Sequence, residues 1–410
     1  MQHSYKNSQT LPPIMQGSPP PVDQQVPAID WDRPPWNRWT FQRMSQVLPT
    51  APIYTTRQSS TANKLQTAPC DIGNITFERE DGATTTIDQL IDDTYTDGFL
   101  IIHNDHVVHE SYYNGMHEQS LHLGQSVSKS IVATAASVLF DKGLINVTSP
   151  VTDYLPELAS TAWNGATVQH VLDMSTGVRF DETYDRRDSD IGKTDVACGW
   201  KPAPADLDTS QWPNSVWEQL LTLTEIETEH GSRFLYRSIE TEVLGFMMER
   251  VTGQRLPEVL SDCLWKPLGA ADHANITVDK LGCSTASGGV SASLRDYARF
   301  GKMLLDNGTV NGKQVVPTWW VDDIRGGSHG LFSEAAQEVF TNGCYRNQFW
   351  IEDESKSTHV CLGVFGQCIY ISPEYNMVAV KLSTWPDFLN HELQRDTVAA
   401  FHAIAETLNR

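Results

Sequence analysis

A serine and a lysine three residues apart are the side chains whose types and spacing best suit nucleophilic chemistry. Ser126 and Lys129 lie in the stretch GQSVSKSIVATAASVLFDKG, residues 124–143. If a helix begins at Ser126, both side chains share one face and the amine reaches the hydroxyl. A buried, neutral lysine accepts the serine proton, and a helix N-terminus favours negative charge on the oxygen. The alternative is a chance S-x-x-K match, so the pair needs support from other segments.

Two further segments supply groups that such a site needs. Tyr236 and Ser238 stand just before a predicted helix in RFLYRSIETEVLGFMMERVTG, where a phenol can work with a lysine in proton transfer. The stretch LGVFGQ reads as a strand whose glycines allow close backbone approach, so the N–H groups of Val364 and Ser126 can form an oxyanion hole. Taken alone, each segment has a structural alternative, a half-buried tyrosine and an ordinary strand.

The elements that must position these groups follow from the apolar pattern. A buried helix is expected from Ser126 to the stop at 141–143, with one stripe formed by Val127, Ile131, Val132, Ala135, Val138 and Leu139. The stretch GFLIIHNDHVVHESYY predicts a hairpin that turns at Asn104-Asp105. Residues 360–385 predict two or three antiparallel strands with turns at Gly366 and Pro373-Glu374, and the last twenty residues predict a helix.

Strands early, helices in the middle and strands late predict an α/β (α+β) fold. An antiparallel sheet flanked by helices would then carry an inserted, mainly helical domain, with the active site in the cleft between them. We expect a sheet domain at 31–124 and 276–410, and a helical domain at 125–275 that begins with the nucleophile helix. Residues 1–30 are rich in Pro, Gln and Ser and predict a flexible tail.

The composition of the chain limits the kinds of partner and the cellular compartment that we expect for it. Lys and Arg total 30 against 51 Asp and Glu, a formal net charge of -21, which disfavours nucleic acid as a partner. There is no apolar run of about 18 residues and no secretory h-region at the start, so we expect no membrane span and a cytoplasmic protein. Seven dispersed cysteines suit free thiols in a reducing compartment. The sequence leaves a homodimer open.

No cofactor and no metal are expected. The spacing of His103, His106 and His109 invites a metal site, but a strand sends His106 to the opposite face from the other two, and a turn intervenes. His329 and His391 are candidates to border a cleft. The sequence contains neither a Walker-type phosphate loop nor a G-x-S-x-G elbow.

The three reactive segments, in this order, resemble the penicillin-recognising serine hydrolases, which include class C β-lactamases, D-alanyl-D-alanine peptidases and esterases. TVQHVLDMSTGV, LWKPLGAADH and SGGVSASLRDYARFGKMLLDNG resemble further family segments. The resemblance is strongest to the 6-aminohexanoate-oligomer (nylon-oligomer) hydrolase branch, where the motif reads SVSKS, and extends from about residue 35 to the C-terminus. It implies a serine β-lactamase-like fold.

The resemblance also implies roles for individual residues. Ser126 would be the nucleophile, Lys129 and Tyr236 the proton-handling pair, and the backbone N–H groups of Ser126 and Val364 the oxyanion hole. The implied substrate contacts are a phenol on the scissile amide nitrogen (Tyr184), a carboxylate on the substrate ammonium (Asp195), and the pocket residues Trp200, Ser287 and Trp350. A linear amino-acid oligomer presents a cation, which gives Asp195 a physical reason beyond the resemblance.

The sequence departs from its relatives around the pocket. Thr285 and Ser287 stand where relatives carry an aromatic residue and an asparagine, and Phe365 stands where they carry a histidine. The Lys-Thr-Gly motif that would supply a cation for a β-lactam carboxylate is missing. We therefore expect a serine hydrolase whose partner is a small-molecule amide or ester, with linear amides of amino-acid oligomers favoured. A carboxylesterase, a D-alanyl peptidase or weak β-lactamase, and a non-catalytic binding module on the same fold are the alternatives.

Overall fold

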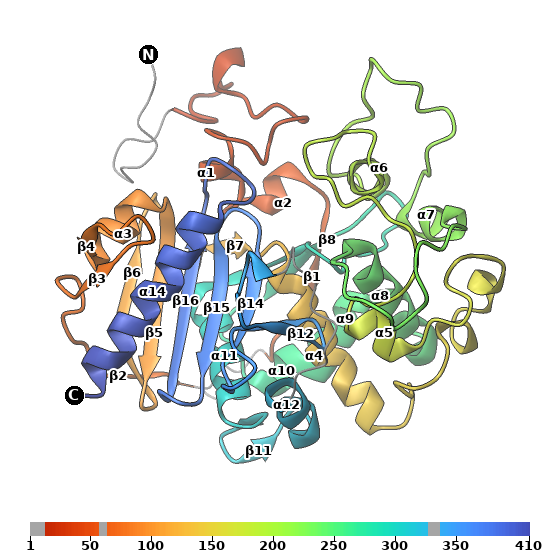
Figure 1. Cartoon of the computed structure of the whole chain (residues 1–410). Coiled ribbons are helices and arrows are strands. Elements are labelled where there is room, and N and C mark those ends of the chain that lie inside the picture. The colour runs from red at the N-terminus through yellow and green to blue at the C-terminus, as the bar shows by residue number, and fades with distance from the viewer. Residues whose placement is uncertain (1–12, 57–63, 327–336) are drawn as a thin grey trace.

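The main sheet joins the early and late parts of the chain. The structure is a computed structural model and describes residues 13–56, 64–326 and 337–410. Eight strands lie in the order β12-β13-β14-β15-β16-β5-β6-β2 (Figure 1). They are β2 (Gln66–Thr67), β5 (Thr96–His103), β6 (His106–Tyr112), β12 (Cys344–Arg346), β13 (Phe349–Ile351), β14 (His359–Gly363), β15 (Gln367–Ser372) and β16 (Met377–Ser383). The sheet is antiparallel except that β2 runs parallel to β6.

Both predicted strand clusters are confirmed. The β5–β6 hairpin turns at Asn104 and Asp105, whose φ angles of 47° and 67° lie in the left-handed region that a two-residue hairpin turn requires. The late segment forms three strands, β14, β15 and β16, in one antiparallel meander. β16 pairs with β5 from Met377 opposite His103 to Ser383 opposite Thr96, so residues about 280 positions apart share the centre of the sheet.

Helices cover the two faces of this sheet. α14 (His391–Leu408) confirms the predicted C-terminal helix and packs on one face with α3 (Ile87–Asp93), where Phe401 stacks on Phe99 at 6.1 Å between ring centroids (Figure 1). α11 (Leu294–Leu305) packs against β15 and β16. A Cβ added at Gly301 of α11 would lie 2.6 Å from Val378 Cγ1, so this helix requires a glycine to reach the sheet.

A smaller sheet leads the chain into the site. Its order is β1-β8-β9-β7, formed by β1 (Thr50–Ile53), β7 (Leu121–Leu123), β8 (Ala274–Thr277) and β9 (Val290–Ser293). All its pairs are antiparallel. Because β7 ends at Leu123, the chain passes from a fixed strand to Ser126 within three residues.

The middle of the chain is mainly helical, as predicted. α4 (Val127–Asp141) packs on α8 (Ser238–Thr252), which ends at Gly253 with φ 67°. α4 is buried on nearly all sides rather than along one stripe, because Ser128, Lys129 and Ser130 are also enclosed. Further helices are α1 (Asn37–Thr40), α2 (Met44–Val47), α5 (Val168–Leu172), α6 (Asp190–Ala197), α7 (Val216–Thr222), α9 (Leu256–Leu260), α10 (Lys266–Leu268) and α12 (Thr318–Arg325).

Short elements complete the described chain. Two small hairpins are formed by β3 (Thr76–Glu78) with β4 (Thr84–Thr86) and by β10 (Thr309–Val310) with β11 (Lys313–Gln314). Single turns are η1 (Val22–Gln24), η2 (Val151–Asp153), η3 (Pro156–Ser160) and the π-turn η4 (Ser261–Trp265). Among the helices that the structure describes, none combines the length and apolarity needed to cross a bilayer.

The sheet and helical parts share one core. Leu100 of β5, Ile131 of α4 and Val243 of α8 belong to a single buried hydrophobic cluster. The division into a sheet domain (31–124 and 276–410) and a helical domain (125–275) stays a prediction. Within the predicted tail, the described part from residue 13 differs from the expectation: Ile14 is buried, and Lys201 Nζ donates to the Ile29 carbonyl at 2.8 Å. These contacts pack that part of the segment on the body of the protein.

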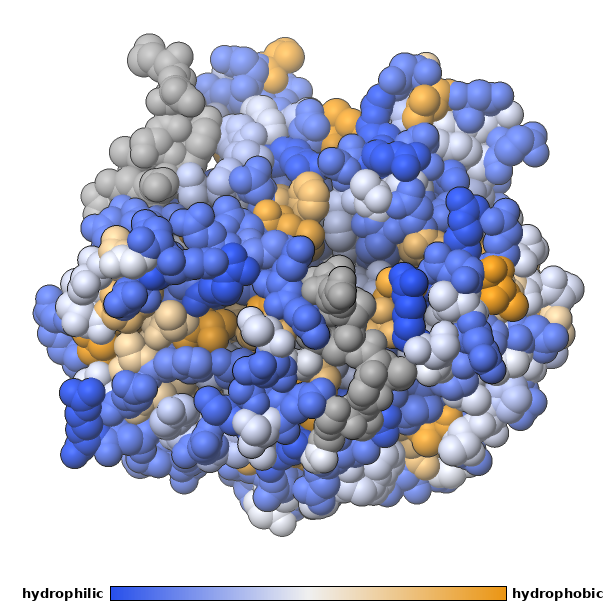
Figure 2. Space-filling model, in the orientation of Figure 1, coloured by the Kyte–Doolittle hydropathy of each residue, from blue (hydrophilic) through white to orange (hydrophobic). Residues whose placement is uncertain are grey.

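Hydrophilic residues predominate on the face seen in Figure 2, and apolar ones are scattered between them. This distribution agrees with the composition, in which a fifth of the residues are charged. This face therefore carries no large apolar patch of the kind that marks a binding surface.

Candidate active site

The predicted contact between Ser126 and Lys129 is present. Ser126 is the N-cap residue of α4, and Lys129 lies in its first turn. Lys129 Nζ donates to Ser126 Oγ at 2.9 Å and to the Ser287 carbonyl at 2.8 Å. Gln125, just before the nucleophile candidate, has φ 50°, a left-handed conformation that a non-glycine residue keeps only where its surroundings fix it. The Ser287 carbonyl thus holds Lys129, and the fixed backbone at Gln125 holds Ser126.

Burial makes Lys129 a base at moderate pH. The side chain is 2% exposed, and its burial lowers the pKa to about 8, against the opposing effect of the carboxylates of Glu182 and Glu242. A lysine in water has a pKa near 10.4 and is almost entirely charged at neutral pH. Here an appreciable fraction of the amine is neutral and able to accept the Ser126 proton.

Tyr236 keeps its proton. The residue lies two positions before α8, with its ring centroid 5.1 Å from Lys129 Nζ. Burial raises the pKa of the phenol above its usual value, although a hydrogen bond with Ser126 opposes the rise. At neutral pH the phenol is therefore a proton donor beside the Ser126 hydroxyl, and Lys129 is the better base of the two.

Ser128 and Ser130, which flank Lys129, form structural hydrogen bonds. Ser128 Oγ accepts from the Val290 amide at 2.9 Å, and Ser130 Oγ donates to the Gln348 carbonyl at 2.7 Å. These bonds fix α4 to β9 and to the turn before β13. Of the three serines in SVSKS, Ser126 is the one that lines the two cavities beside this segment.

The end of β14 comes very close to the nucleophile segment. A Cβ added at Gly363 would lie 2.4 Å from the Gly124 carbonyl oxygen, so only glycine permits this approach. Val364 follows directly and lines the same cavities as Ser126. The chain then turns through Phe365 and Gly366, whose φ angles are 62° and 87°. Val364 and Ser126 thus border the same space, and the oxyanion hole formed by their N–H groups stays a prediction.

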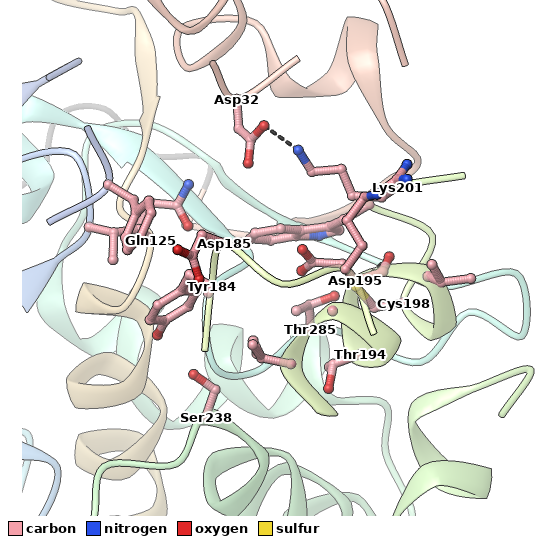
Figure 3. A pocket seen from close by; sticks show the side chains of 18 of the residues that line it. Asp32, Gln125, Tyr184, Asp185, Thr194, Asp195, Cys198, Lys201, Ser238 and Thr285 are labelled. Atoms are coloured by element: carbon pink, nitrogen blue, oxygen red, sulfur yellow. Dashed lines mark hydrogen bonds and ion pairs between the residues drawn. The ribbon is translucent and has the colours of Figure 1, made fainter. Parts of the chain in front are cut away.

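A polar cavity of about 180 Å³ collects most of the predicted site residues (Figure 3). Its wall includes Ser126, Lys129, Tyr184, Asp195, Trp200, Ser287 and Val364. Thr285 and Phe365, two of the positions where the sequence departs from its relatives, also line it. Tyr236 and Trp350 lie on a second cavity, described below.

Asp195 contributes a carboxylate to this cavity from α6. The N-terminus of α6 is fixed by Ser189, whose Oγ accepts from the Gly192 amide at 3.1 Å. Desolvation, and to a smaller extent the nearby Asp32, raise the pKa of Asp195 to about 7. Lys201 is ion-paired with Asp32, above Asp195 in Figure 3. A cationic ligand beside Asp195 would relieve the unfavourable desolvation of its charged form.

Trp200 forms a rigid wall of the cavity. Its Nε1 donates to Thr277 Oγ1 at 3.0 Å, and its carbonyl accepts from Trp31 Nε1 at 2.6 Å. The two indoles meet edge to face at 5.5 Å. Ile29, Asp30, Asp32 and Arg33 add to the same wall. Sequence analysis missed this N-terminal contribution, since only the aromatic Trp31 hints that the segment packs.

Glu182 is a site residue that sequence analysis missed. Its Oε1 accepts from the Tyr184 hydroxyl at 2.7 Å and from the Ser238 hydroxyl, and its Oε2 accepts from the Ser238 amide at 3.0 Å. The acidic stretch around it gave no signal that separated this carboxylate from its neighbours. Tyr184 donates its single hydroxyl hydrogen to Glu182. Its phenolic oxygen can therefore accept a hydrogen bond from a ligand but cannot donate one.

Glu242 is a second missed carboxylate, this time on α8. It is 1% exposed and accepts from the backbone amides of Ala286 and Ser287 at 3.0 and 2.8 Å. The carbonyl of Ser287 is the group that binds Lys129 Nζ. Glu242 therefore fixes the backbone directly before the carbonyl that positions the base. In the sequence it is one acid within an amphipathic helical pattern.

An apolar cavity of about 350 Å³ adjoins the polar one at Ser126. It shares Ser126, Tyr184, Val364 and Phe388 with the polar cavity. The side chains it adds include Phe234, Tyr236, Trp350, Leu362, Trp385, Leu389 and His391. The ring of Trp350 stacks on Tyr236 at 5.7 Å between centroids. His391 thus borders a cleft, whereas His329 lies outside the described residues.

Fold and site together define a serine-nucleophile hydrolase, and the chain belongs to the beta-lactamase family, whose family model matches residues 84–403. This membership confirms the serine β-lactamase-like fold that the sequence predicted. Over 368 residues the chain is 36% identical to the 6-aminohexanoate-dimer hydrolase of Paenarthrobacter ureafaciens, covering 88% of this chain and 89% of that protein. It is 30% identical to Esterase EstB of Burkholderia gladioli over 174 residues, covering 40% of this chain and 41% of the esterase.

A solved structure from Bacillus anthracis resembles the whole chain. Its assignment as a 6-aminohexanoate-dimer hydrolase is itself provisional. The two chains superpose with a TM-score of 0.85 at 26% identity, covering 96% of this chain and 99% of that one. The predicted resemblance to the 6-aminohexanoate-oligomer hydrolase branch is therefore confirmed.

Proposed function

We propose that this chain cleaves linear amide bonds in short amino-acid oligomers of the 6-aminohexanoate-dimer type, through an acyl-enzyme on Ser126. The observation that carries the proposal is the 2.9 Å hydrogen bond from Lys129 Nζ to Ser126 Oγ, made where burial lowers the lysine pKa to about 8. The relative from Paenarthrobacter ureafaciens adds support for the substrate class, since it is named for that dimer.

In the proposed reaction, Ser126 Oγ attacks the amide carbonyl while Lys129 takes its proton. The N–H groups of Ser126 and Val364 bind the oxyanion, and Tyr236 returns a proton to the leaving nitrogen. Water then cleaves the ester on Ser126 and frees the acid. Lys129 and Tyr236 both contact Ser126, so proton transfer in and out needs no movement of the backbone.

Tyr184 favours an amide over an ester in this proposal. Its hydroxyl hydrogen is bound by Glu182 Oε1, so its oxygen accepts the N–H of the scissile amide. An ester has no such donor. The contact also orients the nitrogen lone pair away from Tyr184 while the tetrahedral intermediate forms.

Asp195 is proposed to hold the ammonium end of the substrate. The nearby Asp32 already has Lys201 as its partner, whereas the Asp195 carboxylate lines the cavity that Ser126 faces. A partly desolvated ion pair contributes more than a pair in open solvent, because water screens it less. Trp200, Ser287 and Trp350 are proposed as the remaining substrate-contacting residues.

The test compares the wild type with Ser126→Ala on four substrates: p-nitrophenyl acetate, the 6-aminohexanoate linear dimer, a D-alanyl peptide and nitrocefin. We expect dimer hydrolysis, some ester hydrolysis and little turnover of nitrocefin. The substitution should lower kcat by about 10⁴-fold or more, because nucleophile and base act as one unit. Full activity in Ser126→Ala would refute the assignment, and binding without any Ser126 acylation would favour the non-catalytic alternative.

Carboxylesterase activity is the second candidate. It is supported by the partial match to Esterase EstB and by the apolar cavity beside Ser126, which suits an uncharged group. A kcat/KM for p-nitrophenyl esters that far exceeds every amide value would establish this alternative as the main activity.

For the cellular compartment of the protein, we propose the cytoplasm, because all seven cysteines are free thiols.

A further inference from the structure

Two cavities of different character meet at the nucleophile. Ser126, Tyr184, Val364 and Phe388 line both of them. A substrate whose carbonyl carbon reaches Ser126 Oγ therefore has room for its two halves in different cavities. The two halves of a cleaved molecule then experience different surroundings.

The polar cavity is rich in charge. Its ionisable side chains beyond the catalytic pair include Asp30, Asp32, Asp185, Asp195, Arg33, Arg186, Arg187 and Lys201. Several are already paired with one another, such as Lys201 with Asp32 and Arg187 with the nearby Asp206. The wall thus offers the Asp195 carboxylate to a cationic group, next to side chains that already form ion pairs with one another.

The apolar cavity has the opposite composition. Aromatic and aliphatic side chains form most of its wall, namely Phe234, Trp350, Leu362, Trp385 and Leu389. Its described lining contains neither lysine nor arginine. His391, the nearest approach to a cation in that lining, lies 3.9 Å from Glu338 and so already faces an acid. A carboxylate placed there would meet no lysine or arginine side chain among the described lining residues.

The positions of Tyr236 and Asp195 decide which half of the substrate enters which cavity. The group that protonates the leaving atom must lie beside that atom, and Tyr236 lines the apolar cavity. Asp195, the proposed partner of a substrate ammonium, lines the polar one. The acyl half therefore lies on the Asp195 side and the leaving group on the Trp350 side.

We infer that the apolar cavity is a leaving-group site for uncharged alkyl or aryl amines. Within the linear-amide hydrolysis proposed above, amides that join an ammonium-bearing acid to an apolar amine should then be cleaved faster than oligomers that end in a free carboxylate. This inference rests on the proposed function, whose acyl-enzyme chemistry it uses unchanged. The amide C–N bond breaks, the acyl carbon bonds to Ser126 Oγ, and the amine leaves with the proton taken from the serine.

The test uses two amides with the same acyl half, 6-aminohexanoyl hexylamide and the linear 6-aminohexanoate dimer. Both leave the same 6-aminohexanoyl group on Ser126, so their deacylation steps are identical. We expect kcat/KM for the hexylamide to be at least tenfold higher. Along a butyl, pentyl and hexyl series, each added methylene should raise it about fourfold, the gain typical of a buried methylene. A dimer that is cleaved equally well or better would overturn the inference.

Mass spectrometry of the trapped acyl-enzyme distinguishes a failure of the leaving-group site from a failure of the proposed hydrolase function. Turnover with a 6-aminohexanoyl adduct on Ser126 but a preference for the dimer refutes the leaving-group site alone. The absence of both adduct and turnover with either amide refutes the proposed function, and the inference with it.

A charge placed at the rim gives a second test. Leu389 is 48% exposed, so Leu389→Lys can keep its ammonium in water and should fold normally. It should raise kcat/KM for the dimer several-fold relative to the hexylamide, since it supplies the missing cation. Leu389→Gln controls for polarity, and Leu281→Lys, at a 60% exposed position outside both cavities, controls for added charge. An unchanged ratio of the two substrates in Leu389→Lys contradicts the inference.

Discussion

Replacing Glu242 with glutamine separates a positioning role from a merely structural one. Glu242 accepts from the amides of Ala286 and Ser287 at 3.0 and 2.8 Å, and its charge favours the protonated form of Lys129. Glutamine has nearly the same shape but a single carbonyl oxygen. One buried backbone N–H therefore loses its acceptor, and the charge disappears.

The two losses have separate magnitudes and separate readouts. A buried donor without an acceptor costs about 1–3 kcal/mol, so the free energy of unfolding of Glu242→Gln should fall by that amount in urea titrations at pH 8. If the Ser287 carbonyl shifts with its peptide, kcat should fall by about tenfold, which corresponds to about 1.4 kcal/mol of transition-state stabilisation.

The pH profile carries the decisive result. In the wild type, kcat/KM for an uncharged ester should rise with pH through about 8, because Lys129 is active in its neutral form and its pKa is about 8. Without the Glu242 carboxylate the lysine loses its proton more readily, so the rise in Glu242→Gln should move to lower pH. Glu249→Gln, on the same helix but bonded to the Leu256 amide, should leave the profile unchanged. A rise at the same or higher pH in Glu242→Gln would refute the reasoning.

Three further substitutions test other parts of the site. Asp195→Ala should raise KM for the cationic dimer by about tenfold or more with little effect on p-nitrophenyl acetate, and equal loss on both would contradict the ion pair. In the wild type, KM for the dimer should fall as pH rises through about 7, where Asp195 becomes charged, and this dependence should vanish in the variant. Tyr184→Phe should lower kcat/KM for amides by about tenfold and leave esters nearly unaffected, which a paired amide and ester assay would measure. Gly363→Ala brings a Cβ to 2.4 Å from the Gly124 carbonyl, so both kcat and thermal stability should fall, and a fully active variant would show that the close approach is unnecessary.

The parts of this fold that sequence predicted are those fixed by local spacing. The β5–β6 hairpin follows from Asn104-Asp105 between apolar runs, and the contact of Ser126 with Lys129 follows from one helical turn. The glycine at 363 gave the close approach of the late strand, because no other residue fits there. The hairpin and the Ser126–Lys129 contact need only the chain within a few residues of themselves, whereas the glycine shows that a close approach occurs but not which segment approaches.

The parts that sequence did not predict depend on distant segments meeting. Glu182 and Glu242 influence Lys129 from positions more than 50 residues away, and no motif marks either acid. The segment at 29–33 reaches the polar cavity because Trp31 packs on Trp200 and Lys201 binds the Ile29 carbonyl and Asp32. Likewise, the pattern on α4 predicted one apolar stripe, since a sequence does not reveal that neighbours enclose the polar face as well.

That enclosure is what makes the base work. If α4 presented its polar face to water, Lys129 would keep a pKa near that of a free lysine and would be charged whenever Ser126 needed a base. Complete burial without acids nearby would push its pKa further down, and Glu182 and Glu242 oppose that fall. The value of about 8 is thus a balance between desolvation and two carboxylates. Each acid also fixes a neighbour by hydrogen bonds, Tyr184 for Glu182 and the Ser287 peptide for Glu242. The geometry of the cavity and the basicity of the lysine are therefore set by the same residues, and a substitution that alters one should alter the other.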